Sequence, residues 1–320
     1  MWQLFRQAIV YNRREAKAAV AEINVALQEK GFAALSAQEA KRVGYYTLQS
    51  SITALWFGTL HGRRLTEAER KAKRFAGAFT VFQDDLTDNP DYHYQSFMDL
   101  VEAPEQKVLY HREEWLAWFC YQTMLQAAPD ASLVRRTAVL AEQGQHDSRR
   151  QLLQNLREEE LQEISFHKGG AATLFYRSMM QPEISPAEEK MIYACGDLLQ
   201  WCNDIFDVYK DHHAGVQTLF TSASDLKPWK LQFVQKLESI KAQLRQLPMP
   251  AQGKKSFWHQ YLSVACRGLV CFDQLIALQD ATGGVFNIAQ YERQPTICDM
   301  EKWSNLRASI RYAASFARLE

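Results

Sequence analysis

Residues 185–211 read SPAEEKMIYACGDLLQWCNDIFDVYKD, and this stretch carries the clearest structural signal in the chain. Ser185, with Glu188 three residues later, is typical of a capping box, which satisfies backbone N–H groups at a helix start. Pro186 suits the first helical position. Apolar residues then recur at helical spacing as far as the acidic end. We therefore predict a helix over residues 186–211.

The same helical signals recur along the whole chain. Ser36 with Glu39 and Thr66 with Glu69 form two further capping boxes. Helix-period stretches dominate, strand-like alternation is scarce, and neither an internal repeat nor a linker stands out. These features predict an all-α, single-domain helical bundle over residues 1–320. The predicted helices cover residues 2–30, 37–61, 66–88, 105–127, 131–160, 161–181, 186–211, 228–246, 254–281 and 300–319.

Composition and charge narrow the functional classes. The 320 residues are 47% hydrophobic and 23% charged, which is ordinary for a globular protein. Lys plus Arg equals Asp plus Glu, 37 against 37, which gives no electrostatic case for a nucleic-acid partner. No stretch approaches the roughly 20 apolar residues that a membrane helix needs, and charges interrupt the N-terminal segment too early for a signal peptide. We expect a cytoplasmic protein without a transmembrane segment, and we leave a homodimer open.

Cysteines and one basic run add little to the choice of function. Six cysteines are scattered among apolar residues without a CxxC pair, which suits buried thiols in a reducing compartment. We interpret the basic run as a solvated helix face and loop, with an anion-attracting rim near a phosphate site as the alternative. Its members are Arg63, Arg64, Arg70, Lys71, Lys73 and Arg74.

Two acidic motifs stand near the ends of long capped helices. The first is DDLTD at residues 84–88, and the second is NDIFDVYKD at residues 203–211. From the capping residue to the first motif residue the count is 18 in both helices. At 1.5 Å per residue each motif stands roughly 27 Å above its helix start. If the two helices run parallel in one core, both motifs arrive at the same rim.

Spacing places these acids on the inward face of each helix. Asp84 and Asp88 are four residues apart, so their carboxylates stack on one face. Asn203, Asp207 and Asp211 follow the same spacing, and both rows continue apolar stripes. Stacked carboxylates repel one another and need a cation, and oxygen-only ligands suit Mg²⁺, which takes substrate phosphates as further ligands. The alternative is that the Asp-rich helix ends are only stop signals.

With these motifs the sequence resembles the class I isoprenoid synthase superfamily. DDLTD matches its DDxxD motif, and the second motif resembles the (N/D)DxxSxxxE of terpene cyclases. Asp207 replaces the usual Ser or Thr and Asp211 the usual Glu, which keeps oxygen ligands but shortens the last arm. The second motif also resembles the NDxxDxxxD of membrane aromatic prenyltransferases, although the membrane helices of that branch are missing. The resemblance implies a helical bundle with a central cavity and about three Mg²⁺ ions, bound by Asp84, Asp85, Asp88, Asn203, Asp207 and Asp211.

The resemblance extends to a segment between the motifs. FHKGGAATLFYRSMM, residues 166–180, resembles the kinked helix in which a lysine of this superfamily binds diphosphate and small residues break the helix. Lys168, Gly169 and Gly170 would take these roles. Two glycines inside a helical pattern cost about 1 kcal/mol each, so a kink or a close ligand approach would explain them. The alternative is an ordinary helix boundary.

Further side chains are candidates through the same resemblance. Arg311-Tyr312 resembles the RY pair of bacterial terpene cyclases, whose guanidinium contacts the diphosphate. Arg177 is a further candidate for binding the diphosphate. Aromatic faces can stabilise an allylic carbocation, with core packing as the alternative for each of them. The aromatic candidates for the substrate pocket are Phe79, Phe82, Phe175 and Trp201.

These features predict a lyase, namely a terpene cyclase that uses Mg²⁺ to ionise a prenyl diphosphate of C15–C20 size or longer. The residues expected to act on the departing diphosphate are Asp84, Lys168, Arg311 and Tyr312. One alternative is a chain-elongating or head-to-head prenyltransferase, although the arginine pair and the GGKR-type segment of elongating synthases are absent. A second alternative is a non-enzymatic helical scaffold whose acidic helix ends are surface caps.

Overall fold

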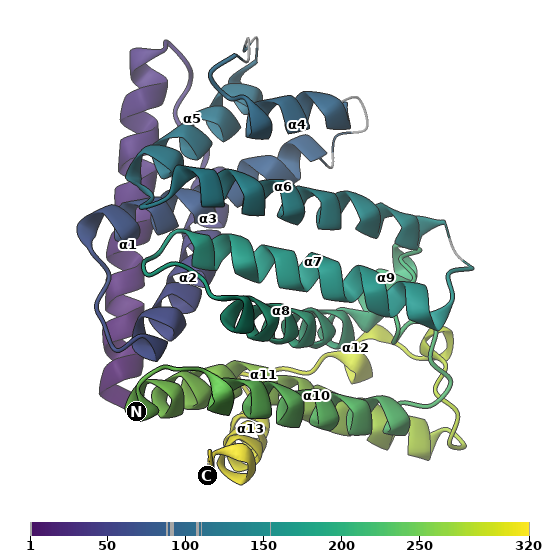
Figure 1. The fold of residues 1–320 in the computed structure, drawn as a ribbon. Coiled ribbons are helices and arrows are strands. Elements are labelled where there is room, and N and C mark those ends of the chain that lie inside the picture. Colours follow the sequence, from purple (N-terminus) through teal and green to yellow (C-terminus); the bar gives the residue numbers. More distant parts are fainter. Residues whose placement is uncertain are drawn as a thin grey trace. The chain divides into compact units, whose positions relative to one another are not determined.

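The computed structural model describes residues 2–87, 89, 93–106, 109, 111–153 and 155–319, with the backbone alone for residues 2–12. Its regular elements are helices, and the described residues contain no strand (Figure 1). The prediction of an all-α fold is confirmed. The elements are α1 (Trp2–Glu29), α2 (Ala37–Leu60), α3 (Glu67–Thr87), α4 (Tyr94–Glu102), α5 (Arg112–Ala127), α6 (Ala131–Asp147), η1 (Ser148–Leu152), α7 (Glu158–Ser178), α8 (Pro186–Phe206), α9 (Val208–His213), α10 (Lys227–Gln246), α11 (Ala251–Ala281), η2 (Ile288–Gln290), α12 (Arg293–Thr296) and α13 (Trp303–Phe316).

Most helix boundaries lie close to their predicted positions, but some helices differ. The predicted helix over residues 131–160 is interrupted, because η1 follows α6 and Asn155 takes a φ of 79°, a left-handed conformation that asparagine tolerates. The short helix α4 lies where none was predicted. The helix expected over residues 186–211 bends at Asp207, which separates α8 from α9.

The chain divides into two compact units. Unit 1 comprises Met1–Gly58, Arg63–Glu142 and Phe175–Glu183, and unit 2 comprises Thr59–Gly62, Gln143–Leu174 and Ile184–Glu320. The first acidic motif belongs to unit 1 and the second to unit 2. The single domain and the central cavity therefore stay predictions.

α3 is the core helix of unit 1. It packs against α1, α4 and α5, and most of its residues are buried. Phe79 lies in an aromatic cluster, with ring centroids 5.0 Å from Tyr121, 6.0 Å from Phe97 and 6.2 Å from Phe175. Such clusters bury large apolar areas and fix the geometry of the helices that carry them. They hold α3, and the acidic motif at its end, within unit 1.

Both capping boxes predicted in unit 1 are complete. The hydroxyls of Ser36 and Thr66 accept hydrogen bonds from the backbone N–H groups of Glu39 and Glu69. Each glutamate carboxylate accepts in return from the backbone N–H of its serine or threonine, at 2.7 Å. These reciprocal bonds fix the starts of α2 and α3.

The capping box predicted at the start of α8 forms only in part. Ser185 Oγ accepts from the Glu188 N–H at 3.2 Å, with Pro186 at the first helical position as predicted. The Glu188 carboxylate lies 3.0 Å from His61 Nε2 within unit 2. The helix start was therefore predicted correctly, although its glutamate contacts a histidine that is distant in sequence.

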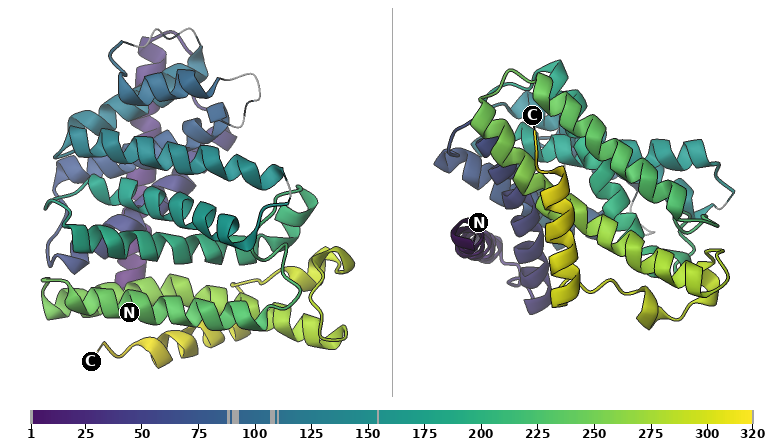
Figure 2. Two further views of the ribbon diagram at one scale, coloured as in Figure 1. Left: turned by 45° about the vertical axis from the view of Figure 1, so that its right-hand side comes forward. Right: turned by 90° about the horizontal axis from the view of Figure 1, so that it is seen from below.

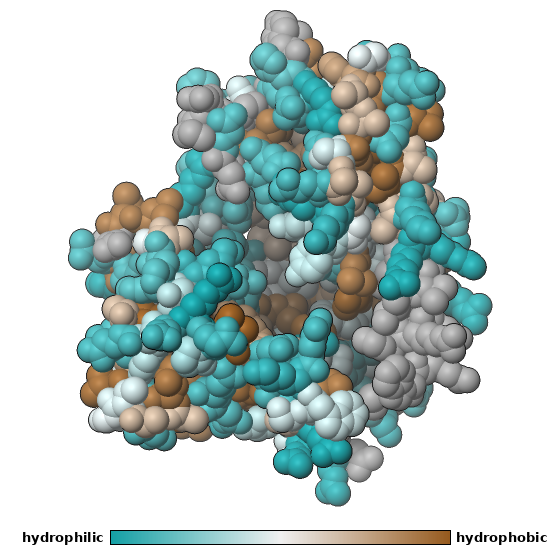
Figure 3. Space-filling view, turned by 180° about the vertical axis from the view of Figure 1, so that it is seen from behind, coloured by the Kyte–Doolittle hydropathy of each residue, from teal (hydrophilic) through white to brown (hydrophobic). Residues whose placement is uncertain are grey.

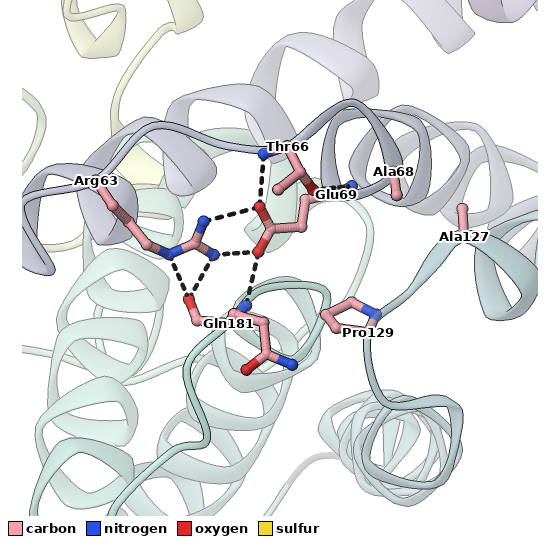
Figure 4. Close-up of a pocket in the computed structure, with 7 residues that line it drawn as sticks. All are labelled: Arg63, Thr66, Ala68, Glu69, Ala127, Pro129 and Gln181. Atoms are coloured by element: carbon pink, nitrogen blue, oxygen red, sulfur yellow. Dashed lines mark hydrogen bonds and ion pairs between the residues drawn. The ribbon is translucent and has the colours of Figure 1, made fainter.

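The Glu69 carboxylate also joins the start of α3 to the segment after α7. Oε2 accepts from Arg63 Nη1 at 2.9 Å, and Oε1 accepts from Arg63 Nη2 and from the Gln181 N–H, the latter at 2.7 Å (Figure 4). Arg63 also donates to the Gln181 carbonyl, from Nε at 3.0 Å and from Nη2 at 2.6 Å. A hollow of about 230 Å³ lies beside this network, and none of its lining residues is a predicted site residue. The network is therefore interpreted as a structural junction.

We expect Glu69→Gln to lower the free energy of unfolding by about 3 kcal/mol, because it leaves the Arg63 charge unpaired in a largely buried network. Burial by itself would raise the pKa of Glu69, but hydrogen bonds from Arg63 and from two backbone N–H groups lower it to about 2. A lowered pKa in the folded state means that this stabilisation is present above pH 4.5 and is lost as the pH falls toward 2. Denaturant unfolding at neutral and at acid pH measures both effects.

Glu67→Gln is the matched control for this prediction. Glu67 lies two residues before Glu69 and pairs with Arg70, but its side chain is 70% exposed. Exposed pairs contribute about 0–1 kcal/mol, so we expect little change. If the Glu69 variant were as stable as the Glu67 variant, the junction would have no structural importance.

α8 and α11 form the core of unit 2. Figure 1 shows α8, α10 and α11 side by side, and Figure 2 shows α13 crossing α11. Contrary to the expectation that no stretch approaches the length of a membrane helix, α11 is long and apolar enough to cross a membrane by length and composition, and it is the one such helix within the described ranges. However, 56% of its most apolar window is buried inside the protein, as in the core helix of a folded unit. This burial agrees with the expected absence of a transmembrane segment.

The basic run of α3 and the preceding loop is largely neutralised by glutamates. The interpretation as a solvated face is wrong for Lys73 and Arg74, which are both buried. The Lys73 amine lies 5.5 Å from the centroid of the Tyr176 ring. The ion pairs of the run are Arg63–Glu69, Arg70–Glu67, Lys71–Glu22, Arg74–Glu15 and Arg74–Glu22.

On the face drawn in Figure 3, hydrophilic residues predominate and hydrophobic ones lie among them in separate groups.

Candidate functional site

The second acidic motif occupies the end of α8 and the short helix α9. Asp207 forms a bend with φ −93° and ψ 6°, yet its N–H still donates to the Asn203 carbonyl at 2.9 Å. The Asp211 N–H donates to the Asp207 carbonyl at 2.8 Å, so the row continues across the bend. Asn203 is exposed, contrary to its predicted inward position, and Asp207 and Asp211 are half-buried. The most buried acid of the motif is Asp204, which lies outside the predicted row.

Gly169 of α7 and Gly196 of α8 meet at a close helix crossing. A Cβ added to Gly169 would lie 2.2 Å from the Gly196 carbonyl oxygen, and the reverse substitution would give 2.1 Å. A Cβ on Gly170 would lie 2.2 Å from the Tyr193 ring. α7 continues through both glycines, so an ordinary helix boundary is excluded. The glycines allow α7 and α8 to approach each other at a distance that no side chain permits.

This crossing brings Lys168 within electrostatic reach of the acids in α8 and α9. Burial raises the pKa of Asp204 to about 7, although a hydrogen bond from Gln200 at 2.7 Å and the charge of Lys168 oppose the change. Burial, followed by the charge of Asp207, raises the pKa of Asp211 to about 6, again against the charge of Lys168. The lysine therefore does not fully offset the burial and mutual repulsion of these carboxylates.

The first acidic motif lies at the end of α3, where α2 supplies its partners. The Tyr46 hydroxyl donates to Asp84 Oδ2 at 2.7 Å. Arg42, one turn earlier on α2, forms an ion pair with Asp85. Asp84 is half-buried and Asp85 is exposed. Asp88, the last predicted ligand of this motif, lies outside the described residues.

α2 and α3 also cross closely, at Gly77. A Cβ on Gly77 would lie 2.7 Å from the backbone of Thr47. Gly77 precedes Asp84 by seven residues, as Gly196 precedes Asn203. In each unit, a glycine two turns before the acidic motif thus brings a neighbouring helix against the acidic helix. That neighbour supplies a basic or hydrogen-bonding side chain to the motif.

Arg177 is fully buried in unit 1. Its guanidinium donates to the carbonyls of Met180 at 2.8 Å and Pro182 at 2.9 Å, and lies 5.9 Å from the centroid of the Phe57 ring. These contacts tie the segment after α7 to the end of that helix. The contact with diphosphate stays a prediction for this residue.

The predicted aromatic residues all lie in the cores of their units. Phe79, Phe82 and Phe175 are buried in unit 1. Trp201 is buried in unit 2, where the Lys236 amine lies 4.6 Å from the centroid of its ring. Such packing is what the alternative of core residues predicts. Contact with a carbocation stays a prediction for each of them.

Tyr312 anchors α13 to α10 and α11. Its hydroxyl donates to Asp273 Oδ2 at 2.5 Å and accepts from Lys230 Nζ at 3.1 Å. Lys230 also forms an ion pair with Asp273. The adjacent Arg311 is exposed, and its role in binding diphosphate stays a prediction.

We expect Tyr312→Phe to lower the free energy of unfolding by about 1 kcal/mol, because it removes both hydrogen bonds of the hydroxyl while keeping the ring. Arg311→Gln, at the adjacent exposed position, should change it by less than about 0.5 kcal/mol. Urea unfolding of the two variants measures the difference. Equal effects of both substitutions would argue against the anchor.

Some residues beside the motifs were not predicted from the sequence. Tyr46 and Arg42 lie 38 and 43 residues before their acidic partners, and no local pattern links them. Asp204 could have been singled out, because it stands inside the second motif and directly follows Asn203. It lies outside the row of every fourth residue, which predicts only Asn203, Asp207 and Asp211 as ligands.

The donor chemistry of both motifs fits Mg²⁺. The side chains offer carboxylate and amide oxygens, which this ion prefers. The raised pKa values of Asp204 and Asp211 indicate a cluster that an added cation would stabilise. In the part of the chain that the structure describes, no three His, Cys, Asp or Glu side chains already form a metal-holding group. The ligand set therefore stays a prediction.

Comparison of the chain with protein-family models, with curated proteins and with solved structures finds no match. The likeness to class I isoprenoid synthases consequently depends on the motifs and on the chemistry around them. Membership of that superfamily stays a proposal.

Proposed function

We propose that this chain is a class I terpene cyclase, which ionises an allylic prenyl diphosphate and releases diphosphate and a cyclic or rearranged terpene. The observation that carries the proposal is the cluster at the end of α8. There Lys168 lies within electrostatic reach of the buried Asp204 and of Asp211. A lysine beside oxygen ligands for Mg²⁺ is suited to binding a diphosphate, because the lysine ammonium and the metal ion together neutralise the negative charge of the phosphates.

A scaffold with ordinary acidic helix ends would not require a buried carboxylate near a lysine. A stop signal at a helix end leaves its carboxylates in solvent, whereas Asp204 is only 6% exposed. Burial of a carboxylate beside other carboxylates costs free energy unless a ligand or a cation compensates it. Buried carboxylates with raised pKa values are common at functional sites.

Residues of both motifs have separate tasks in the proposed reaction. Asp84, Asn203, Asp207 and Asp211 would hold Mg²⁺. The bound ions supply Lewis-acid stabilisation to the leaving diphosphate. Lys168 and Arg311 would donate to the diphosphate oxygens and stabilise the charge that develops as the C–O bond breaks. Apolar and aromatic side chains would exclude water from the hydrocarbon part of the substrate.

The direct test is incubation of the purified protein with geranyl, farnesyl and geranylgeranyl diphosphates and Mg²⁺, followed by diphosphate and volatile-product analysis. Release of diphosphate with a cyclic or rearranged hydrocarbon from a single substrate is the expected result. A longer diphosphate formed only with added isopentenyl diphosphate would identify a prenyltransferase instead. No diphosphate release from any substrate would leave the helical scaffold as the better account.

Lys168→Met gives a second test of the same site. The substitution keeps an apolar stem of similar length and removes the charge, so the KM for the diphosphate should rise about tenfold or more. Lys190→Met is the matched control, because Lys190 is exposed on α8 away from the acidic end. Equal KM values in the two variants would contradict the role of Lys168.

A further inference from the structure

Two cysteines that are distant in the sequence meet within unit 2. Cys271 lies on α11, and Cys298 lies in the segment between α12 and α13. Both are free thiols, and their side chains form a hydrogen bond with each other. The two sulfur atoms are therefore neighbours although no disulfide joins them.

The segment that carries Cys298 is fixed against α11 by Gln274. This residue follows Cys271 by three positions, so the two side chains lie on the same face of the helix. Its Nε2 donates to the carbonyls of Pro295 at 2.8 Å and Ile297 at 3.0 Å. The backbone directly before Cys298 is thus held one helical turn from Cys271. The meeting of the two thiols follows from this attachment of the segment to the helix.

The two thiols differ in their access to solvent and in their reactivity. Cys271 is fully buried, whereas Cys298 is 7% exposed and directly follows Ile297, which is 42% exposed. The hydrogen bond from the Cys271 thiol lowers the pKa of Cys298, because it stabilises the thiolate. The thiolate is the form of cysteine that attacks oxidants. Cys298 is therefore the more reactive of the two.

A further hydrogen bond connects this thiol pair to the second acidic motif. The Cys271 thiol donates to the Ile205 carbonyl at 3.4 Å. Ile205 lies in the last turn of α8, between Asp204 and Asp207. The last carbonyls of a helix have no partner within the helix, and here the thiol supplies one. Loss of the thiol hydrogen would therefore change the hydrogen bonding at the motif.

We propose that Cys298 and Cys271 form a peroxide-sensitive thiol pair that closes to an intramolecular disulfide and thereby alters the end of α8. The Cys298 thiolate attacks one oxygen of hydrogen peroxide, the O–O bond breaks, hydroxide leaves, and the cysteine becomes a sulfenic acid. The Cys271 sulfur then attacks the sulfenic sulfur, which forms the S–S bond. The sulfenic oxygen leaves as water.

The two thiols lose two electrons and two protons in this sequence, and the peroxide becomes two molecules of water. Oxidation of the pair needs neither a metal ion nor a prenyl substrate. The inference therefore goes beyond the proposed function and does not depend on it.

The test is disulfide mapping by mass spectrometry, after brief treatment of the folded, reduced protein with hydrogen peroxide and alkylation of the remaining thiols. We expect the peptide of Cys271 linked to that of Cys298, with the link reversed by a thiol reductant. Cys120 is the internal control, because it is buried in unit 1 and burial raises the pKa of its thiol. It should be oxidised at least about tenfold more slowly. A different cysteine pairing, or equal oxidation of Cys120, would overturn the inference.

Two variants test which thiol is attacked first. Cys271→Ser keeps a hydroxyl donor but no second thiol, so Cys298 should accumulate as a sulfenic acid that dimedone labels. Cys298→Ser should give no label at Cys271, which is fully buried. Circular dichroism checks that each variant is folded. Label at Cys271, or none at Cys298, would contradict the proposed attack by Cys298.

Hydrogen–deuterium exchange of the reduced and the oxidised protein tests the connection to the acidic motif. The disulfide removes the thiol donor from the Ile205 carbonyl, so the amides of residues 203–211 should exchange at least about twofold faster in the oxidised protein. Peptides from α3 in unit 1 are the control and should exchange equally in both forms. Equal exchange at residues 203–211 would overturn the effect on the end of α8.

Discussion

Asp84→Asn is expected to lower Mg²⁺-dependent release of diphosphate by about a thousandfold. The substitution keeps the size of the side chain and an oxygen for the Tyr46 hydroxyl, but removes the negative charge that would hold a metal ion. Lewis-acid stabilisation by a bound ion contributes several kcal/mol to the barrier, and about 4 kcal/mol corresponds to a thousandfold change in rate. Steady-state release of diphosphate from the best prenyl substrate measures the effect.

Asp99→Asn is the control for this experiment. Asp99 is an exposed acid on α4 that accepts a hydrogen bond from Gln95 on the same helix. Its replacement should leave the rate of release unchanged. A rate for Asp84→Asn within about tenfold of the original protein would mean that the first motif is not part of the reacting site.

Gly196→Ala is expected to destabilise unit 2 by about 3 kcal/mol or more. The added methyl group would lie 2.1 Å from the carbonyl oxygen of Gly169 and 2.7 Å from the Thr173 hydroxyl, so α7 and α8 would have to move apart. Backbone atoms cannot give way as the end of a flexible side chain can. Chemical denaturation followed by circular dichroism gives the free energy of unfolding.

Gly44→Ala provides a control of the opposite sign. Gly44 is also inside a helix, but among the described residues a Cβ there would meet only the Ala16 Cβ at 3.8 Å, an ordinary contact. Alanine is favoured over glycine in a helix interior by about 1 kcal/mol, so this variant should be slightly more stable. If Gly196→Ala were also stabilising, the close crossing that brings Lys168 to the acids would not exist.

Helix starts could be predicted from the sequence because their signals are local. Ser36, Thr66 and Ser185 each lie three residues from the glutamate that completes the pattern, and all three helices start where expected. The break after α6 was missed because no glycine or proline marks it, and the left-handed Asn155 has no distinctive neighbours. α4 was missed because nine residues are too few for a clear period.

Only those features of the candidate site that lie within one helix could be predicted from the sequence. The acidic rows follow from spacing within one helix, and so does the inward stripe that contains Gly77 and Gly196. Helix crossings depend on packing between segments that are distant in the chain, so the approach of Tyr46 to Asp84 could not be read from either segment. For the same reason, Gly169 was expected to kink α7 or to approach a ligand, whereas it allows α8 to approach.

The proposed function requires both acidic helix ends to bind one diphosphate through shared metal ions. A crystal structure of the protein with Mg²⁺ and inorganic diphosphate tests it most directly. The proposed function predicts a diphosphate whose metal ions are bound by Asp84 on one side and by Asn203, Asp207 and Asp211 on the other, with Lys168 donating to its oxygens. A diphosphate bound by only one motif, or bound elsewhere on the protein, would contradict it.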